Sequence, residues 1–221
     1  MEPCNPAVLD ETAPLLILGG GGHGRVVAEI ARDLGCPAVA FLDDDPQVPE
    51  LLGPLKRCDD RDLRQRYSQA LVAIGQAQLR LEWLDRLQHL GFACPVLVHP
   101  RAWVSPTAQL GSGAVVMPQA AVMAGARLGR GCIVNTAASI DHDCVLADGV
   151  HVCPGAHLAG DVTVGEGSWI GIGASVIQGR RIAARVTVGA GAAVVHDLAE
   201  GVTAVGLPAR PLSQHSRRSE P

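Results

Sequence analysis

The sequence predicts an α/β domain built on a small parallel sheet, followed by a parallel β-solenoid. In the C-terminal half, aliphatic residues occupy every sixth position without exception. In the N-terminal half, short apolar strands alternate with helical segments, which is typical of a small parallel sheet. The composition, with 3% aromatic residues and 26 glycines in 221 residues, indicates a core of aliphatic and small side chains.

The six-residue repeat defines the solenoid. Because six is a multiple of two, the repeated residues lie on one side of an extended chain, and small residues permit a corner in each repeat. Three flat faces then close a coil of about eighteen residues, so this run predicts about five coils. Mostly Ala precedes each repeat position by two, and Arg180 is the one bulky exception. The positions are Val104, Leu110, Val116, Val122, Leu128, Val134, Ile140, Leu146, Val152, Leu158, Val164, Ile170, Val176, Ile182, Val188 and Val194.

The N-terminal half contains a strand, a glycine turn and a helix in succession. Short apolar runs predict three strands, and helical segments follow the first and the third of them. We place the domains at residues 1–97 and 98–212, because a proline-flanked strand near residues 95–100 leads into the repeat, and we expect a flexible tail over 213–221. The strands are 14–18, 38–42 and 70–74, and the helices are 25–31 and about 79–90.

The glycine turn is a candidate nucleotide site. Gly19, Gly21 and Gly24 fit the pattern G-x-G-x-x-G between a strand and a helix, and Asp43 and Asp44 follow about twenty residues later. Helix N-terminal amides favour an anionic group, and the carboxylates suit a ribose hydroxyl or a base edge. The alternative is that the glycines only pack the strand against the helix. NAD is disfavoured because the domain contains only half of a dinucleotide fold.

Polar and titratable residues gather at Asn135 and at 139–144 in an otherwise small and apolar repeat. His142 suits a general base, and an adjacent carboxylate, Asp143 or Asp141, would fix its tautomer. His151 follows half a coil later, so within one chain it should not stack on His142. In a side-by-side oligomer the two could face each other across a cleft. The alternative is that both histidines are polar residues on exposed faces.

Charge and cysteine content exclude other classes. The net charge is −4 and the basic residues are scattered, which disfavours nucleic acid as a partner. The seven cysteines form no C-x-x-C pair and the N-terminus lacks a signal-like segment, so we expect reduced thiols and a cytoplasmic location. The apolar segment 15–18 is far too short for a membrane span.

Together these motifs are similar to those of the hexapeptide-repeat acyltransferases, which join a small Rossmann-like domain to a left-handed parallel β-helix. The likeness covers roughly residues 15–212 and is strongest to bacterial sugar-nucleotide N-acetyltransferases, such as those for bacillosamine and perosamine, and to sialic acid O-acetyltransferases. The motifs are Gly19-Gly20-Gly21-Gly22-His23-Gly24, Phe41-Leu42-Asp43-Asp44, Ala73-Ile74-Gly75 with Arg80, His99-Pro100, Asn135-Thr136, Ile140-Asp141-His142-Asp143-Cys144, Val150-His151-Val152 and Val205-Gly206-Leu207-Pro208-Ala209-Arg210.

The resemblance implies an acetyl transfer from acetyl-CoA to the amine of a nucleotide-linked amino sugar in a homotrimer, with no metal required. It implies that His142 is the base, that Asp143 orients it and that Asn135 belongs to the active site. Acetyl-CoA would lie between adjacent β-helices, near His151, Gly160, Ile172 and Ala190. The nucleotide sugar would contact Gly20, Gly21, Gly22, His23, Gly24, Asp43, Asp44, Gly75 and Arg80. The family often has Glu where this chain has Asp143, and Gly where it has Ala190.

Several alternatives accompany direct attack by the amine. A thiol route would use Cys144 or Cys153, and a zinc-dependent carbonic anhydrase would use His142, His151 and His157. A sialic acid O-acetyltransferase and a non-catalytic nucleotide-binding trimeric scaffold are further candidates. The residue pattern does not separate UDP from GDP. The cations Arg180, Arg181 and Arg185 fit either CoA phosphates or a solvated charged face.

Overall fold

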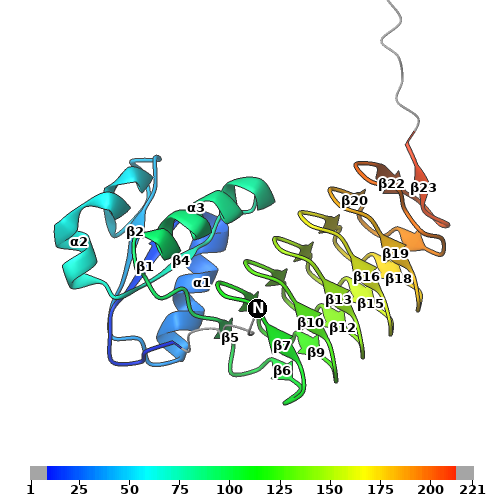
Figure 1. Ribbon diagram of the computed structural model, residues 1–221, viewed down its shortest axis with the longest axis horizontal. Helices are drawn as coiled ribbons and strands as arrows, with labels where there is room; N and C mark the ends of the chain where they lie inside the picture. Colours follow the sequence, from blue (N-terminus) through cyan, green and yellow to red (C-terminus); the bar gives the residue numbers. More distant parts are fainter. Residues whose placement is uncertain (1–8, 213–221) are drawn as a thin grey trace, which may run out of the picture.

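The computed structural model describes residues 9–212, so the tail expected over 213–221 lies outside the described residues. An α/β domain lies beside the first coils of a solenoid, whose coils are stacked in a row up to the C-terminal strand β23 (Arg210–Pro211) (Figure 1). None of the helices within residues 9–212 has the length and apolar character that a bilayer crossing needs. This architecture confirms the predicted fold class.

The N-terminal sheet has four parallel strands in the order β3-β2-β1-β4. Alternate side chains of β1 face two helix layers, since Leu15 and Ile17 pack in the cluster of α1 whereas Leu16 and Leu18 pack in the cluster of α3. A strand covered on both faces is apolar throughout, as this one is. The elements are β1 (Leu15–Leu18), α1 (Gly22–Asp33), β2 (Val39–Leu42), β3 (Leu51–Gly53), η1 (Leu55–Asp59), α2 (Arg61–Arg66), β4 (Gln69–Val72) and α3 (Ala77–His89).

The predicted strands and helices of this domain are confirmed to within a few residues. The short elements β3, η1 and α2 were not predicted, because their segments carry too few apolar residues to show a period.

The solenoid consists of two-residue strands, apart from the three-residue β22, that form three parallel sheets in which neighbouring strands come from successive coils. Its strands are β5 (Leu97–Val98), β6 (Trp103–Val104), β7 (Gln109–Leu110), β8 (Val115–Val116), β9 (Ala121–Val122), β10 (Arg127–Leu128), β11 (Ile133–Val134), β12 (Ser139–Ile140), β13 (Val145–Leu146), β14 (His151–Val152), β15 (His157–Leu158), β16 (Thr163–Val164), β17 (Trp169–Ile170), β18 (Ser175–Val176), β19 (Arg181–Ile182), β20 (Thr187–Val188), β21 (Ala193–Val194) and β22 (Thr203–Val205). The terminal β23 pairs antiparallel to β22.

The repeat positions form the predicted interior column. From Val116 onward they are buried in a single cluster, and the two in the first coil, Val104 and Leu110, pack against it from a less covered position. At the corners, every sixth residue from Gly113 to Gly191 has a positive φ, which favours glycine. Five corners are not glycine, and one of them is Asp143, with φ 58°.

The solenoid has about six coils rather than the predicted five. Val96 and Val98 follow the same six-residue rule as the repeat, and β5 pairs with β8 of the next coil instead of extending the N-terminal sheet. The sequence analysis starts the repeat at Val104 and treats this run as the connection that leads into it. The expected boundary between residues 97 and 98 therefore falls inside β5, and the solenoid begins at Leu97.

Polar atoms inside the solenoid are paired with corner carbonyls. The Ser168 hydroxyl donates to the carbonyl of Ala183 at 2.8 Å and accepts from the amide of Val186 at 3.0 Å. The thiols of Cys132 and Cys144 donate to the carbonyls of Ala147 and Ala159, each 15 residues later in the chain, as for Ser168 and Ala183. Such bonds satisfy groups at the corners that cannot reach water.

Replacing Ser168 with alanine should therefore destabilise the solenoid. The change leaves the Val186 amide and the Ala183 carbonyl without this partner, and we expect a loss of about 2 kcal/mol in the free energy of unfolding. Urea denaturation measures this loss, with Ser175→Ala, at an exposed position of β18, as the control. Equal stabilities of the two variants would show that the buried hydroxyl contributes nothing.

Helix α3 lies along one column of solenoid corners. A β-carbon at Gly113 would meet Leu84, one at Gly149 would meet Leu81 and Ala77, and one at Gly167 would meet Ala77. One helical turn rises 5.4 Å and neighbouring strands are about 4.8 Å apart, so successive turns of α3 meet successive coils. Glycine at these corners lets the helix approach closely.

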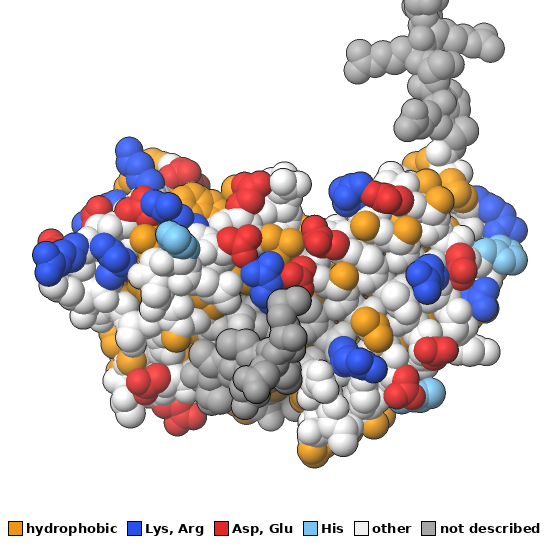
Figure 2. All heavy atoms as spheres, viewed as in Figure 1, with side chains coloured by type: hydrophobic (Ala, Val, Ile, Leu, Met, Phe, Trp, Pro, Cys, Tyr) orange, Lys and Arg blue, Asp and Glu red, His pale blue; other side chains and the backbone are white. Residues whose placement is uncertain are grey.

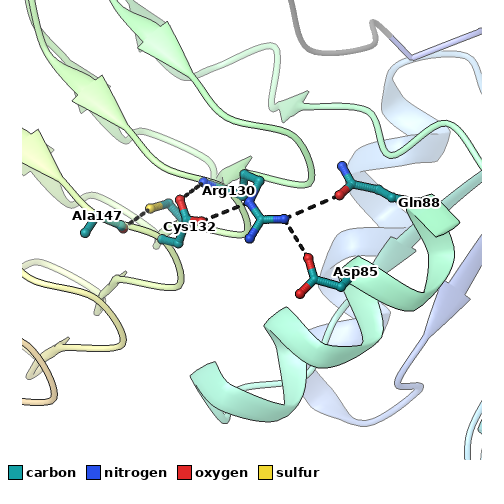
Figure 3. A network of polar contacts seen from close by, with 6 residues as sticks. Asp85, Gln88, Arg130, Cys132 and Ala147 are labelled. Atoms are coloured by element: carbon teal, nitrogen blue, oxygen red, sulfur yellow. Dashed lines mark hydrogen bonds and ion pairs between the residues drawn. The ribbon is translucent and has the colours of Figure 1, made fainter. Parts of the chain in front are cut away.

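An ion-pair network closes the same interface from outside. Arg130 bonds to Asp85 of α3 at 2.6 Å and to Asp148 of the next coil at 2.9 Å, and its further contact to Gln88 is seen in Figure 3. Elsewhere on the face shown in Figure 2, basic and acidic side chains are interspersed over both domains, without the continuous basic stripe that a nucleic-acid backbone needs. The two domains are thus joined by apolar packing and by charges.

Candidate active site

The glycine turn lies at the carboxyl end of β1, where the strand order of the sheet reverses between β1 and β4. Ligands of open parallel sheets bind at such a switch point. The glycines serve two purposes. A β-carbon at Gly24 would lie 1.9 Å from the carbonyl oxygen of Gly19, so this glycine allows the strand to pack against the helix. A β-carbon at Gly21 or at Gly75 would have no other atom within 4 Å. The backbone of these two residues is open to a ligand.

Helix α1 begins without a side-chain cap and without an acidic residue in its first turn. Such an N-terminus attracts an anionic group. The Asp43 carboxylate accepts the amide of Gly20 at 2.6 Å and that of Asp45 at 2.9 Å, while Asp44 accepts the amide of Leu55 at 3.1 Å. The two acids therefore shape the rim of the site through backbone bonds, and the amides nearer the helix start are the candidates for a phosphate.

Arg80, which the resemblance implies to contact the nucleotide sugar, is buried between the loop after β4 and the solenoid, and that contact stays a prediction. The residue is 1% exposed, and its guanidinium donates to four backbone carbonyls. Two belong to the loop after β4 and two to solenoid corners: Ile74 at 2.7 Å, Gly75 at 2.8 Å, Gly131 at 2.8 Å and Gly149 at 2.7 Å. Four of its five N–H donors therefore hold the backbone of the two domains together.

His151 lies on β14 at the interface with the N-terminal domain, and is 7% exposed. The amide oxygen of Asn135 accepts from the Thr136 backbone, so its nitrogen faces His151 and donates to Nε2 at 3.0 Å. The proton of His151 is consequently on Nδ1. Burial lowers the pKa of His151 to about 3, and the positive charge of Arg80 adds to this effect. His151 is therefore a neutral hydrogen-bond donor, not a base.

Two aromatic rings flank His151. The Trp169 ring, one coil later and 39% exposed, lies 4.2 Å from it between centroids, and the ring of His23 in the glycine turn lies 6.4 Å away. Burial also lowers the pKa of His23 to about 4. Among the described residues, Nδ1 of His151 and Nε2 of His23 are buried without a hydrogen-bond partner. His23 thus lies between the glycine turn and the solenoid strand that carries His151. Trp169 is a neighbour of His151 that the sequence analysis missed.

His142 occupies the turn after β12, on a different sheet from His151. Its Nδ1 is 2.9 Å from the Asp143 carboxylate, and its backbone amide donates to Asp141 at 2.7 Å. The hydrogen bond to Asp143 raises the pKa of His142, and the charges of Asp141 and Asp161 act in the same direction. With Nδ1–H directed to Asp143, the Nε2 lone pair of a ring that is 61% exposed is free to accept a proton.

Gly160 lies one coil after His142 and forms the surface on which the imidazole rests. A β-carbon there would lie 2.4 Å from Nε2 and 2.5 Å from Cε1 of His142. Any larger residue would displace the ring. The resemblance implies that Gly160 lies near acetyl-CoA, which stays a prediction, whereas its contact with the His142 ring is found from the geometry.

Within one chain the expected site residues form two groups. Asn135, His151 and His23 lie together, and His142, Asp143 and Gly160 lie together at another corner. Ile172 and Ala190 lie in the turns after β17 and β20, two strands of the sheet that contains His151. Both residues are exposed, Ile172 to 61%.

Within one chain the geometry disfavours the thiol route, and the other candidate residues have partners of their own. Burial raises the pKa of the Cys144 thiol and raises that of Cys153 to about 12, which disfavours a thiolate nucleophile. Over residues 9–212 no three His, Cys, Asp or Glu side chains are grouped to hold a metal ion. His157 instead bonds to Ser139 at 2.8 Å. Arg180 and Arg185 pair with Asp197 and Glu200, as a solvated charged face would.

A nucleotide-type α/β domain joined to a β-solenoid with an exposed histidine–carboxylate pair defines an acyltransferase of the hexapeptide-repeat class. Residues 14–87 match the family model described as the PglD N-terminal domain. The acetyltransferase domain of PglB from Neisseria gonorrhoeae FA1090 is 44% identical with a TM-score of 0.88, over 91% of this chain and 100% of that one. It has also been solved in complex with acetyl coenzyme A.

PerB from Caulobacter crescentus, in complex with CoA and GDP-perosamine, is 39% identical with a TM-score of 0.87, over 91% of this chain and 98% of that one. A histidine-to-asparagine variant of this perosamine N-acetyltransferase has been solved with the same ligands. The chain belongs to this family of sugar N-acetyltransferases.

Proposed function

We propose that this protein transfers the acetyl group of acetyl-CoA to the amine of a nucleotide-linked amino sugar. The observation that carries the proposal is the His142–Asp143 pair, whose free Nε2 is exposed above Gly160 in a member of a sugar N-acetyltransferase family. The open backbone at Gly21 and Gly75 and the uncapped start of α1 suit the nucleotide diphosphate.

In the reaction, His142 accepts the proton of the sugar amine at Nε2 as the nitrogen attacks the thioester carbon. Asp143 holds the Nδ1–H and stabilises the imidazolium that forms. The tetrahedral intermediate then collapses and the CoA thiolate leaves. The proton held by His142 is available to this thiolate. Negative charge on the thioester oxygen needs a donor, for which a backbone amide of the glycine-rich coil is the first candidate and the Nδ1–H of His151 the second.

A homotrimer with acetyl-CoA between adjacent solenoids would unite the two groups of residues. His142 and His151 lie on different faces of one chain, so a neighbouring copy is the simplest way to bring them to one cleft. The exposed Trp169 and Ile172 beside His151 suit such a contact. Light scattering on the purified protein tests the trimer. We place the reaction in the cytoplasm, where the buried cysteines of residues 9–212, which are unpaired, stay reduced.

The reaction is tested with purified protein, acetyl-CoA and a panel of UDP- and GDP-linked amino sugars, following the release of free CoA. We expect release with one amino sugar and none with the matching hydroxy sugar. Release with a sialic acid or its nucleotide form instead would indicate O-acetylation. The absence of CoA release with every acceptor would favour the non-catalytic scaffold.

Asp143→Asn should shift the acidic limb of the pH–rate profile to lower pH. His142 must be unprotonated to act, so the rate rises as the pH rises through its pKa. Asp143 raises that pKa, and the neutral amide, which keeps an acceptor for Nδ1–H, removes most of the increase. The plateau should also fall, because the base is weaker. Asp161→Asn, a weaker contributor, is the control, and equal shifts in both variants would contradict the assigned pairing.

A further inference from the structure

Arg80 is a buried cation that meets only backbone carbonyls. Its guanidinium is bonded to Ile74, Gly75, Gly131 and Gly149, so every nitrogen of the group is used, and none of these acceptors is a carboxylate. Burying a charge without a counter-ion is costly, and these hydrogen bonds offset part of the cost. Burial lowers the pKa of Arg80 to about 10, so the group remains charged at neutral pH.

The four carbonyls come from both halves of the proposed site. Gly75 follows β4 at the switch point, where the backbone is open to a ligand. Gly149 lies two residues before His151, and Gly131 occupies the same corner of the preceding coil. The planar guanidinium therefore joins the loop at Gly75 to the coil that carries His151.

We propose that Arg80 is a positioning residue that fixes the loop at Gly75 against the coil of His151, so that the bound sugar is aligned with the acetyl group. The inference rests on the proposed function. The charge of Arg80 also helps to keep His23 and His151 neutral, since it lowers the pKa of both. A lysine cannot replace it, because an ammonium cannot span four carbonyls in a plane.

The test uses Arg80→Lys and Arg80→Met in the full chain, with Arg130→Met as the matched control. Arg130 crosses the same interface through exposed ion pairs and makes no bond to the Gly75 loop. Misalignment of about 1 Å costs roughly 100-fold, so we expect kcat to fall by about that factor in both Arg80 variants. The KM for the nucleotide sugar and the dissociation constant of acetyl-CoA should change less than about threefold. Arg130→Met should retain its kcat.

Two results would overturn the proposal. One is an unchanged kcat in the Arg80 variants. The other is a loss of kcat that accompanies an equal loss of acetyl-CoA binding and of the β-solenoid circular dichroism, which would make Arg80 a folding residue only.

If the Arg80 variants do not fold, a pair of glycine variants gives the answer. A β-carbon at Gly149 would lie 3.0 Å from Leu81 of α3, whereas one at Gly167 would be in ordinary contact with Ala77 at 3.7 Å. Both corners have similar positive φ, so the backbone strain is matched. Gly149→Ala should lower kcat by about tenfold more than Gly167→Ala, because it moves the helix that carries Arg80. Equal values would refute the proposal.

Hydrogen exchange separates failure of this proposal from failure of the proposed function. It needs no turnover, so it is valid even if no amino sugar is accepted. Amides at 73–76 and 149–151 should exchange faster in Arg80→Met than in Arg130→Met, while the N-terminal sheet stays protected. Equal exchange would overturn the role of Arg80, whereas absent CoA release by the wild type would overturn only the function.

Discussion

His142→Ala is expected to lower kcat/KM for the amino sugar by about 1,000-fold. If His142 is the base that we propose, the alanine removes the acceptor for the proton of the attacking amine and leaves Asp143 without its partner. The dissociation constant of acetyl-CoA should stay within a few-fold, because the lost interaction acts mainly in the transition state. Steady-state CoA release and a binding titration measure the two quantities.

His157→Ala is the control for this variant. His157 is another exposed histidine of the solenoid, and its visible partner is Ser139. Full activity in the control would exclude the three-histidine zinc alternative at the same time. Comparable activity of His142→Ala and the wild type would contradict the mechanism.

Gly160→Ala should lower kcat by roughly 100-fold while the protein stays folded. The new methyl group would overlap the imidazole of His142, since the β-carbon position is 2.4 Å from Nε2. Gly160 has no positive φ, so its backbone accepts alanine, and the ring must move off the line of proton transfer. Single-turnover kinetics at saturating acetyl-CoA separates this effect from weaker cofactor binding.

A double variant identifies the cause of that loss. If Gly160 acts only through the ring, then Gly160→Ala combined with His142→Ala should be no slower than His142→Ala alone. Additive losses would mean that Gly160 contributes through another route, such as direct contact with the acetyl group.

The fold was largely predictable because the apolar residues that form its core recur at regular intervals in the sequence. The column from Val116 to Val194 follows from spacing alone, and the strand–turn–helix at the N-terminus follows from the glycines. Only the start of the first coil was missed, because the repeat was counted from Val104 although Val98 fits the same period. The short β3 carried no period at all.

The sequence proposes a set of candidate site residues, but only part of their geometry could be anticipated from it. The pair of His142 and Asp143 is adjacent in sequence, so its contact could be anticipated. The hydrogen bonds of Arg80 could not be anticipated, because its four acceptors are backbone atoms up to 69 positions away, which leave no pattern in the side chains. Trp169 lies one coil, or eighteen residues, after His151, and applying the coil length to each polar residue would have found it.

The most direct test of the account is the chemical identity of the product formed by the wild type from acetyl-CoA and the accepted nucleotide sugar. Mass spectrometry and NMR of the purified product show how many acetyl groups were added and to which atom. The account predicts a single acetyl group in an amide on the sugar amine, stable to hydroxylamine, and no acetylated protein. An ester on a hydroxyl group, or an acetyl group covalently held by the enzyme, would contradict it.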